Sequence, residues 1–385
     1  MLRAVSIQLT DACNLACSYC YFAHKAPRAM DPATIEATLA FCLANADPAA
    51  PRFGVNFFGG EPFLAAESMD RLATALSCGF AAHHPRLALR FSTTTNGTLF
   101  DARALELVQR HRIHVQLSLD GEGRAHDRYR RYRNGRGSFE RIEHNLPLLK
   151  QTPGFGVRMT VTPETVDALP DGIGYLLDSG VMRIAVAPVS EEEWSEAALE
   201  AFARAWRRVT ARCLIEQQAG AQPRLRMAAA DQAAIEEEAG RIGCEFGCGA
   251  AVHFAFIDHN GAIYPCQRYP GYFDRSPEVR IGSVFEGLDP LQRSRFIAAN
   301  RCGAKRVCAA FTPRESALSG SQFCRDCLVS GSCGGSCFAL NHFVTGDPVR
   351  PPATPGRIRQ IMLAVKWQTE KFEEMQRSTK ELVHV

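Results

Sequence analysis

Residues 10–22 read T-D-A-C-N-L-A-C-S-Y-C-Y-F and follow directly on a short apolar run that is predicted to be a strand. This stretch contains Cys13, Cys17 and Cys20 at the spacing C-x3-C-x2-C. Three thiolates on one loop can hold three irons of a cubane cluster and leave the fourth iron open, as a chelating cofactor requires. The alternative is structural zinc, but zinc prefers four ligands in two separated pairs, and only His24 lies close enough to be the fourth.

Short apolar runs alternate with amphipathic stretches through the first half of the chain. The predicted strands are 5–9, 54–58, 87–92, 114–118, 156–162 and 183–187, and the predicted helices are 32–44, 67–83, 102–112, 138–149 and 167–178. Six strands separated by helices predict an α/β fold with a parallel sheet, either curved or closed. Right-handed crossovers place the carboxyl ends of all strands, and hence the site, on one face.

Three motifs follow predicted strands in order. They are G-G-E at 59–61, T-T-N-G-T at 94–98 and S-L-D-G at 118–121, and H-D-R-Y-R follows at 126–130. Each motif alone is weak, since G-G-E also suits a simple turn. Together with the cysteine spacing, and with Tyr19 just before the last cysteine, they resemble the radical S-adenosylmethionine (SAM) family. The resemblance implies a partial (β/α)6 TIM-like barrel.

In that family the open iron is chelated by the amino and carboxylate groups of SAM. An electron from the cluster cleaves SAM, and the resulting 5′-deoxyadenosyl radical abstracts hydrogen from the substrate. The resemblance implies that the G-G-E segment holds the methionine ammonium, that Ser118 faces the ribose and that Arg130 pairs with the carboxylate. The cofactor-binding residues expected on this basis are Tyr19, Gly59, Gly60, Glu61, Asn96, Ser118 and Arg130.

A second cysteine region has the spacing C-x2-C-x5-C-x3-C, and a G-A-I-Y-P-C segment lies upstream of it. This region resembles the SPASM extension of radical SAM enzymes, which binds auxiliary 4Fe–4S clusters. The resemblance implies one auxiliary cluster on Cys244, Cys248, Cys266 and Cys337, and a second on Cys324, Cys327 and Cys333.

The second auxiliary set lacks its fourth cysteine. T-G-D-P is present at 345–348, but Pro355, Gly356 and Arg357 stand where the family has a cysteine. Four alternatives remain for this cluster: three ligands only, a ligand borrowed from Cys302 or Cys308, an oxygen or nitrogen ligand such as His342 or Asp347, or no cluster at all. We therefore expect one catalytic and one or two auxiliary clusters.

Composition constrains the remaining expectations. The 385 residues are 46% hydrophobic and 22% charged with a net charge of +3, so neither a nucleic acid nor a membrane is an expected partner. No secretory signal or membrane span is evident, which predicts a cytoplasmic protein. Fifteen clustered cysteines then indicate metal sites rather than disulfides. Cys42, Cys78 and Cys213 lie in predicted helices and are predicted to be buried core thiols.

The predicted organisation has four parts. Residues 1–190 are the barrel, 191–242 a helical bridge, 243–350 a small cysteine-rich iron–sulfur domain and 351–385 a C-terminal helix.

SPASM-bearing relatives modify peptides or proteins, so the resemblance implies a radical SAM oxidoreductase that acts as a peptide maturase. It would abstract hydrogen from a ribosomally made peptide to form a crosslink or a thioether, or to epimerise a residue. One alternative is an anaerobic sulfatase-maturing enzyme, which makes formylglycine with an aspartate as general base. Here Gln267 occupies that position, and a neutral amide cannot accept the proton. A non-enzymatic iron–sulfur electron carrier is the alternative from another class.

The expected partners are a peptide or protein substrate and a reductant such as flavodoxin or ferredoxin. Because Cys13 comes so early, no peptide-recognition domain is expected before the barrel, and a separate peptide-recognition protein is one way to supply that role. The sequence assigns no catalytic residue, modified residue, bond type or oligomeric state.

Overall fold

The computed structural model describes residues 1–22, 25–221, 224–227, 249–301 and 337–347, together with Ile358, Ile361 and Val365. Its strands form one 11-stranded sheet in the order β11-β10-β9-β8-β1-β2-β3-β4-β5-β6-β7. The strands are β1 (Ala4–Thr10), β2 (Arg52–Gly59), β3 (Ala88–Thr95), β4 (His114–Ser118), β5 (Gly156–Val161), β6 (Arg183–Pro188), β7 (Arg224–Met227), β8 (Phe254–Ile257), β9 (Ala262–Tyr264), β10 (Gly282–Ser283) and β11 (Gly287–Leu288).

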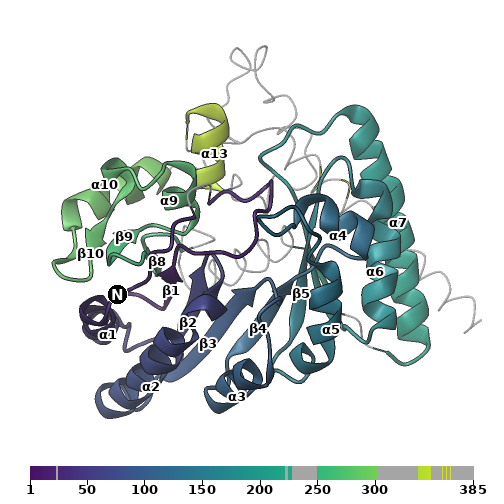
Figure 1. The fold of residues 1–385 in the computed structure, drawn as a ribbon. Helices are drawn as coiled ribbons and strands as arrows, with labels where there is room; N and C mark the ends of the chain where they lie inside the picture. The colour runs from purple at the N-terminus through teal and green to yellow at the C-terminus, as the bar shows by residue number, and fades with distance from the viewer. Residues whose placement is uncertain are drawn as a thin grey trace, which may run out of the picture.

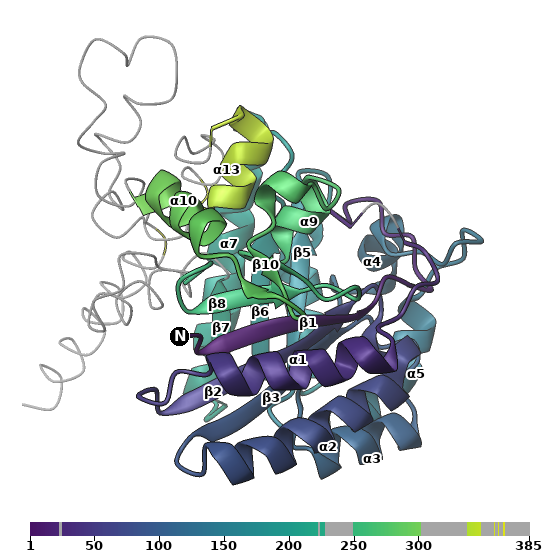
Figure 2. The same ribbon diagram turned by 90° about the vertical axis from the view of Figure 1, so that its left-hand side faces the viewer.

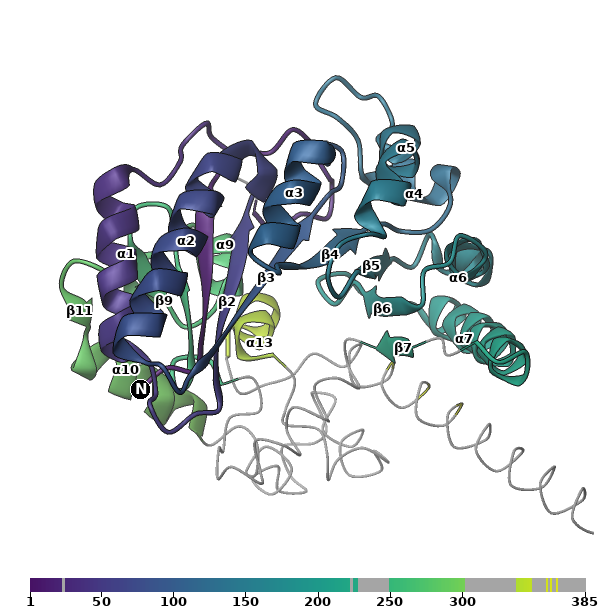
Figure 3. The ribbon, with the colours of Figure 1, turned by 90° about the horizontal axis from the view of Figure 1, so that it is seen from below.

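The predicted α/β barrel sheet is confirmed. The six predicted strands are β1 to β6, and they pair in parallel in sequence order. The five predicted helices are α1 (Pro32–Asn45), α2 (Ala66–His83), α3 (Ala102–Arg110), α5 (Phe139–Leu149) and α6 (Leu169–Asp178). Each crossover helix packs on the convex side of the sheet, as the views in Figures 1 and 3 show. The curved sheet and its outer helices are therefore the expected partial barrel.

Local chemistry sets where the first helices begin. Asp31 caps α1 by accepting a hydrogen bond from the Thr34 N–H at 2.7 Å, and Pro32 occupies the first turn. Asp101 caps α3 in the same way, through the Ala104 N–H at 2.9 Å. Both helices therefore start immediately after a loop that leaves the carboxyl end of a strand.

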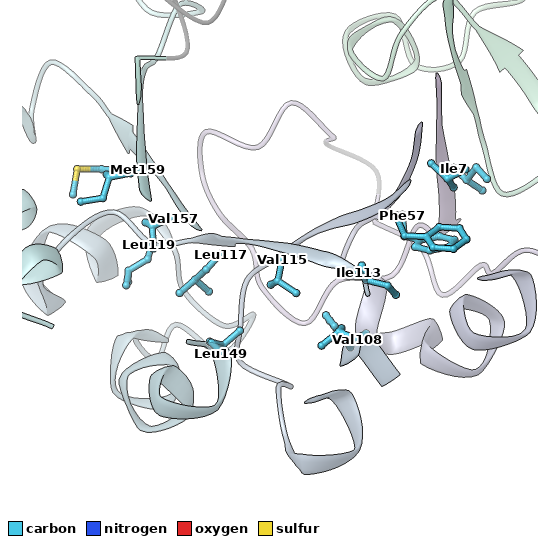
Figure 4. Close-up of a cluster of buried hydrophobic side chains, with 14 of the residues drawn as sticks. Ile7, Phe57, Val108, Ile113, Val115, Leu117, Leu119, Leu149, Val157 and Met159 are labelled. Atoms are coloured by element: carbon cyan, nitrogen blue, oxygen red, sulfur yellow. The ribbon is translucent and has the colours of Figure 1, made fainter. Parts of the chain in front are cut away.

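The apolar core lies between the sheet and its outer helices. Alternate strand residues such as Phe57, Leu117 and Val157 are at most 1% exposed and pack against helix residues such as Val108 and Leu149. Figure 4 shows these side chains between β2, β4, β5 and the helices outside them. Because side chains alternate along a strand, the intervening residues face the concave side.

The sheet extends beyond the predicted six strands at both ends. Beyond β6, β7 (Arg224–Met227) adds a seventh parallel strand, although helices were predicted through this stretch. The helical prediction holds for α7 (Glu196–Gln218), which precedes β7. At the other end β8 pairs in parallel with β1 and leads into the β9–β10–β11 meander.

Three short helices accompany these added strands. They are α9 (Arg268–Tyr272), α10 (Pro290–Arg301) and α13 (Phe338–Thr345), and Figure 2 shows them grouped above β8 and β1. The sheet thus runs across the predicted boundary at residue 190, while the other domain boundaries stay predictions. Most of the predicted C-terminal helix lies outside the described residues. None of the described helices is long and apolar enough to cross a membrane.

The three cysteines predicted to be core thiols differ in exposure. Cys42 and Cys213 are buried, as predicted. Cys78 is exposed, so the prediction was wrong for this residue. It lies on the solvent-facing side of α2, whose buried positions are Met69, Leu72, Ala73, Leu76 and Phe80.

Candidate active site

The cluster loop, which we define as residues 11–31, leaves β1 and crosses the concave side of the sheet toward α4 (Gly123–Tyr129), as Figure 1 shows. Two backbone hydrogen bonds hold it there, from the Ala16 N–H to the Arg131 carbonyl at 2.8 Å and from the Ser18 N–H to the Tyr129 carbonyl at 3.2 Å. The loop that carries the three predicted cluster ligands is therefore held at both its β1 end and its far side.

Asp11 anchors the start of the cluster loop. Its side chain is fully buried and forms ion pairs with Arg28 (2.9 Å) and Arg275. Gln8 donates a hydrogen bond to the same carboxylate at 2.9 Å. Arg275 follows α9 and has a φ of 58°, a left-handed conformation that is costly for a residue with a β-carbon. The segment after α9 is thus held in a strained conformation in which its guanidinium reaches the cluster loop.

The three cysteines on the loop are free thiols, with Cys13 buried and Cys17 and Cys20 half-buried. Burial raises the pKa of Cys13 to about 11 and also raises the pKa of Cys17. Lys25 and Arg130 act in the opposite direction on Cys17, because their positive charges favour a thiolate. Cations beside three cysteines suit an anionic iron–sulfur cluster, whose binding would release the thiol protons.

The described residues contain no group of three or more His, Cys, Asp or Glu side chains that converge as ligands of one metal ion. A cubane cluster binds each thiolate at a different iron, so its ligands need not converge on one point. The three thiols are therefore compatible with an iron–sulfur cluster, and His24, the candidate fourth ligand of the zinc alternative, lies outside the described residues. The predicted ligands Cys13, Cys17 and Cys20 lie together on this one loop.

The G-G-E segment packs directly on the cluster loop. The Gly60 N–H donates to the Thr10 carbonyl at 2.9 Å, and the Glu61 N–H donates to the Ala12 carbonyl at 2.8 Å. A β-carbon on Gly60 would lie 2.2 Å from the Ala12 carbonyl oxygen, and one on Gly59 would lie 2.7 Å from that of Thr10. In this structure both glycines are needed because the backbone of the cluster loop approaches so closely.

The Glu61 carboxylate is 1% exposed and is held by neighbouring donors. It accepts hydrogen bonds from the Thr95 hydroxyl (2.7 Å), the Asn96 N–H (2.7 Å) and the Phe63 N–H (3.2 Å). Burial raises its pKa to about 7. Three of the roughly four acceptor positions of this carboxylate are therefore filled by the protein itself.

Asn96 connects the end of β3 to the cluster loop. Its side-chain amide donates to the Asn14 oxygen at 2.9 Å and accepts from the Thr98 N–H at 3.0 Å. Asn14 in turn donates to the Thr98 hydroxyl at 2.7 Å. Asn14 lies between two predicted cluster ligands, so the T-T-N-G-T motif fixes the loop between Cys13 and Cys17.

Asp120 and Arg130 form the buried charged pair of the site, with the Arg130 Nε–H donating to Asp120 at 2.8 Å. Asp120 also accepts from the Tyr19 hydroxyl and from the Thr160 N–H. The Arg130 guanidinium lies 5.2 Å from the centre of the Tyr19 ring. Tyr19, predicted from its place beside the last cysteine, is thereby joined to Arg130 across the concave face. Ser118, at the end of β4, is buried nearby.

His126 is linked by hydrogen bonds to both residues of this pair. Its Nδ1 accepts from the Asp120 N–H at 3.2 Å, so its Nε2 carries the hydrogen and donates to the Ser138 hydroxyl at 3.0 Å. The Ser138 hydroxyl in turn donates a hydrogen bond to the Arg130 carbonyl oxygen at 2.7 Å. Burial lowers the pKa of His126 to about 4, which keeps the ring neutral.

Two predicted auxiliary-cluster ligands lie within the described residues. Cys266 follows β9 and Cys337 immediately precedes α13, and both pack against one apolar cluster around Phe256 and Tyr269. Cys20 packs against the same cluster. The predicted ligands that lie outside the described residues are Cys244, Cys248, Cys324, Cys327 and Cys333, as are the alternative ligands Cys302 and Cys308.

A second charged cluster lies near Cys266. Arg268 forms an ion pair with Glu191 at 3.2 Å, and the Tyr272 hydroxyl donates to the same carboxylate. The Arg268 guanidinium lies 5.8 Å from the centre of the Tyr21 ring and 5.7 Å from that of Tyr272. Two tyrosine faces and one carboxylate thus hold this arginine beside the cluster loop.

Sequence reasoning missed the residues that hold the site together. Asp120 could have been identified as a site residue, because it stands inside the quoted S-L-D-G motif directly after a strand. Asp11, beside the first cysteine, had a similar signal. Arg275 has none, because its partner is 264 residues away in sequence and only the fold brings the two together. Arg28 lies in the same loop as Asp11, but no motif marks it as the partner of that carboxylate.

Comparison with known proteins is consistent with this geometry. Residues 7–173 match the radical SAM superfamily. A serine-type anaerobic sulfatase-maturating enzyme of Klebsiella aerogenes is 35% identical over 144 residues, which cover 36% of this chain and 35% of that enzyme. The chain spans 35–61% of the length of this enzyme and of two other curated relatives that it matches.

Two further similarities extend over most of the chain. An AdoMet-dependent heme synthase of Oleidesulfovibrio alaskensis is 24% identical over 356 residues, which cover 85% of this chain and 86% of that protein. The solved structure of native anSMEcpe with bound AdoMet and Cp18Cys peptide superposes with a TM-score of 0.70 at 18% identity, covering 98% of this chain and 99% of the other. At this identity the superposition shows a shared fold.

Proposed function

Because residues 7–173 of this chain are a radical SAM domain, which uses SAM and 4Fe–4S chemistry, we propose that the protein is an enzyme that modifies a ribosomally made peptide. When bound, the cluster and SAM supply a 5′-deoxyadenosyl radical that takes a hydrogen atom from the substrate. The product would be a crosslink, a thioether or an epimerised residue. We prefer peptide maturation to sulfatase maturation because Gln267, next to Cys266, has an amide side chain.

Different residues of the chain would bind the cluster and the two ends of the methionine part of SAM. Cys13, Cys17 and Cys20 would hold the catalytic cluster. Arg130 donates its Nε–H to Asp120, and the one other hydrogen bond of its guanidinium within the described part of the chain is a long one to Thr160, at 3.4 Å. A guanidinium has five N–H groups, so Arg130 retains donors for the methionine carboxylate of SAM. Glu61 has about one acceptor position left for the ammonium end.

Gln267 separates the two peptide-directed candidates. Its side-chain oxygen is buried and has no hydrogen-bond partner among the residues that the structure describes. An amide oxygen can accept a hydrogen bond from a substrate but cannot take up its proton at neutral pH, whereas formylglycine formation is expected to need a carboxylate there. Epimerisation returns a hydrogen atom to the substrate radical and releases no proton, so this reaction does not need the base. Crosslink or thioether formation releases one proton and one electron after the hydrogen abstraction, so it would need a proton acceptor other than Gln267 and an auxiliary cluster as electron acceptor. This difference favours peptide maturation over sulfatase maturation.

The decisive experiment offers a sulfatase-motif peptide containing Cys to the anaerobically reconstituted protein, with SAM and dithionite. We expect 5′-deoxyadenosine but no mass shift to formylglycine. An anaerobic sulfatase-maturating enzyme given the same peptide is the positive control. Efficient conversion by this chain would assign it to sulfatase maturation instead. Absence of 5′-deoxyadenosine under every condition would favour the electron-carrier alternative.

The heme synthase similarity supports a second candidate function, because it extends over 85% of the chain rather than the first half alone. In this alternative the substrate is a tetrapyrrole and the reaction forms haem. The test is incubation with an iron-tetrapyrrole precursor, SAM and dithionite, followed by chromatography of extracted haem. Haem formed only with SAM would replace the peptide proposal.

The number of auxiliary clusters is a separate part of the proposal. We expect three clusters in total, with the second auxiliary cluster taking a borrowed or non-cysteine fourth ligand. That corresponds to about twelve irons per chain, against about eight for two clusters. Iron analysis of the reconstituted protein distinguishes the two. A Cys302→Ala/Cys308→Ala variant then tests whether one of these thiols is the borrowed ligand.

A further inference from the structure

Arg158 on β5 is a charged residue on the concave face that the proposed mechanism does not use. Its neighbours along the strand, Val157 and Met159, are 1% exposed and belong to the outer core. Arg158 therefore points to the opposite side, together with Thr160. Thr160 contacts Arg130 through its hydroxyl, which places this side of β5 beside the expected SAM-binding residues.

The residues beside Arg158 on the sheet are small. Its register partners are Ser118 on β4 and Ala185 on β6. Registered residues on neighbouring strands point to the same face, so Arg158 stands between a hydroxymethyl and a methyl group. Neither neighbour extends far from the sheet. The Arg158 side chain therefore extends past both neighbours over the concave side, and the residue is half-buried. The charged or titratable groups nearest to it are Arg268, Tyr21, Arg130 and Glu191.

Arg158 differs in its partners from two other arginines near this face. Arg130 is paired with Asp120 at 2.8 Å, and Arg268 is paired with Glu191 at 3.2 Å. For Arg158 the described part of the chain provides neither a hydrogen-bond acceptor nor a carboxylate at ion-pair distance. Burial and the nearby positive charges of Arg268 and Arg130 lower the pKa of Arg158, while Tyr21 and Glu191 act in the opposite direction without cancelling this effect. An added negative charge at this place would therefore be stabilised.

From these contacts we propose that Arg158 binds a carboxylate of the substrate. A guanidinium presents parallel N–H donors that match the two oxygens of a carboxylate, and the pair is strongest where water is partly excluded. The substrate would then be an acidic peptide that places a Glu or Asp side chain, or its C-terminal carboxylate, against β5 beside Ser118. This inference rests on the proposed peptide-modifying function.

The methionine carboxylate of SAM is the other source of the same chemistry, so the experiment must separate the two. The probes are fluorescent hexapeptide pools with amidated C-termini, one with Glu and one with Gln fixed at the third position. A third pool carries Gln and a free C-terminal carboxylate. Anisotropy gives the affinity of each pool for the anaerobically reconstituted full chain with SAM bound.

We expect the wild-type protein to bind a carboxylate-bearing pool more tightly than the amidated Gln pool, by roughly ten- to a hundredfold. Arg158→Gln should remove that preference and Arg158→Lys should restore part of it, since lysine keeps the charge but loses the paired donors. The matched control is Arg183→Gln, an exposed arginine on β6. Calorimetric titration of Arg158→Gln with SAM should give wild-type affinity.

Three results would overturn the proposal. They are equal binding of all pools by the wild type, an unchanged preference in Arg158→Gln, and loss of SAM affinity in that variant, which would assign Arg158 to the cofactor. Failure of every pool to bind would count against the peptide function instead. A second measurement then still tests the carboxylate: phenylglyoxal labelling of Arg158, read by mass spectrometry. N-acetylglutamate amide should protect the residue and N-acetylglutamine amide should not, whereas equal labelling would contradict the inference.

Discussion

The two faces of the same sheet are stabilised in different ways. On the convex face, side chains such as Phe57, Leu117 and Val157 are almost fully buried and are held by close packing. On the concave face, a polar row crosses neighbouring strands: Asn56 donates to the Ser6 hydroxyl at 2.9 Å and accepts from the Ser92 hydroxyl at 3.1 Å. Substitutions should therefore affect stability on the convex side and cofactor or substrate binding on the concave side.

The largest effect is expected from the concave side. Replacing Cys13, Cys17 and Cys20 together with Ala should abolish reductive SAM cleavage, because no other residues are proposed to hold the catalytic cluster. Anaerobic assay for 5′-deoxyadenosine checks this. The matched control is Cys78→Ala, which removes an exposed thiol and should keep wild-type activity. Continued cleavage by the triple variant would show that the cluster is held elsewhere.

On the convex side, Leu117→Ala should cost about 2–5 kcal/mol of the free energy of unfolding, because it leaves a cavity at a side chain with no exposure. Urea unfolding measures this. The protein that stays folded should bind SAM with unchanged affinity, as calorimetry can test. A large loss of SAM affinity without a loss of stability would contradict the division between the two faces.

Arg130→Ala should weaken SAM binding by roughly ten- to a hundredfold, since removing one partner of a charge-assisted pair costs about 1.5–3 kcal/mol. Isothermal titration with the cluster in place checks this. Because the substitution also leaves Asp120 unpaired, Asp120→Asn/Arg130→Ala serves as the companion variant. Wild-type affinity in both would remove Arg130 from the SAM site.

The smallest expected effect concerns His126, which is neutral and buried behind the concave face. Its pKa of about 4 lies below the value of about 6.5 for an unfolded histidine, so the unfolded chain takes up the proton first. Stability from this group is therefore present above pH 6.5 and lost as the pH falls toward 4. Between pH 7 and pH 5 the wild type should lose about 2 kcal/mol more than His126→Asn in urea unfolding. Equal losses would mean that the pKa of His126 in the fold equals that in the unfolded chain.

The two faces also differ in how far the sequence predicts them. The convex face follows from alternating apolar residues, so the six barrel strands and five helices could be located closely. The sequence motifs pointed to Glu61, Asn96 and Arg130. They did not indicate the residues that form hydrogen bonds or ion pairs with these three side chains. Those partners depend on which strand ends lie side by side.

The least predictable contact is that between Asp11 and Arg275, which are 264 residues apart in sequence. No local pattern marks an arginine after a short helix as the partner of a carboxylate beside the first cysteine. The strand β7 was missed for a related reason, because its four residues are too short to show periodicity within an apparently helical stretch.

The parallel pairing of β1 with β8 has a consequence for biosynthesis. The register partner of Ile7 is Ile257, which is made 250 residues later, and Arg275 is made later still. At typical elongation rates of about 5–20 residues per second, β1 lacks this neighbour for roughly 10–50 s. During that interval the cluster loop has no Arg275 to hold it, so we expect the nascent thiols to be most accessible to iron–sulfur donors before the C-terminal third has folded.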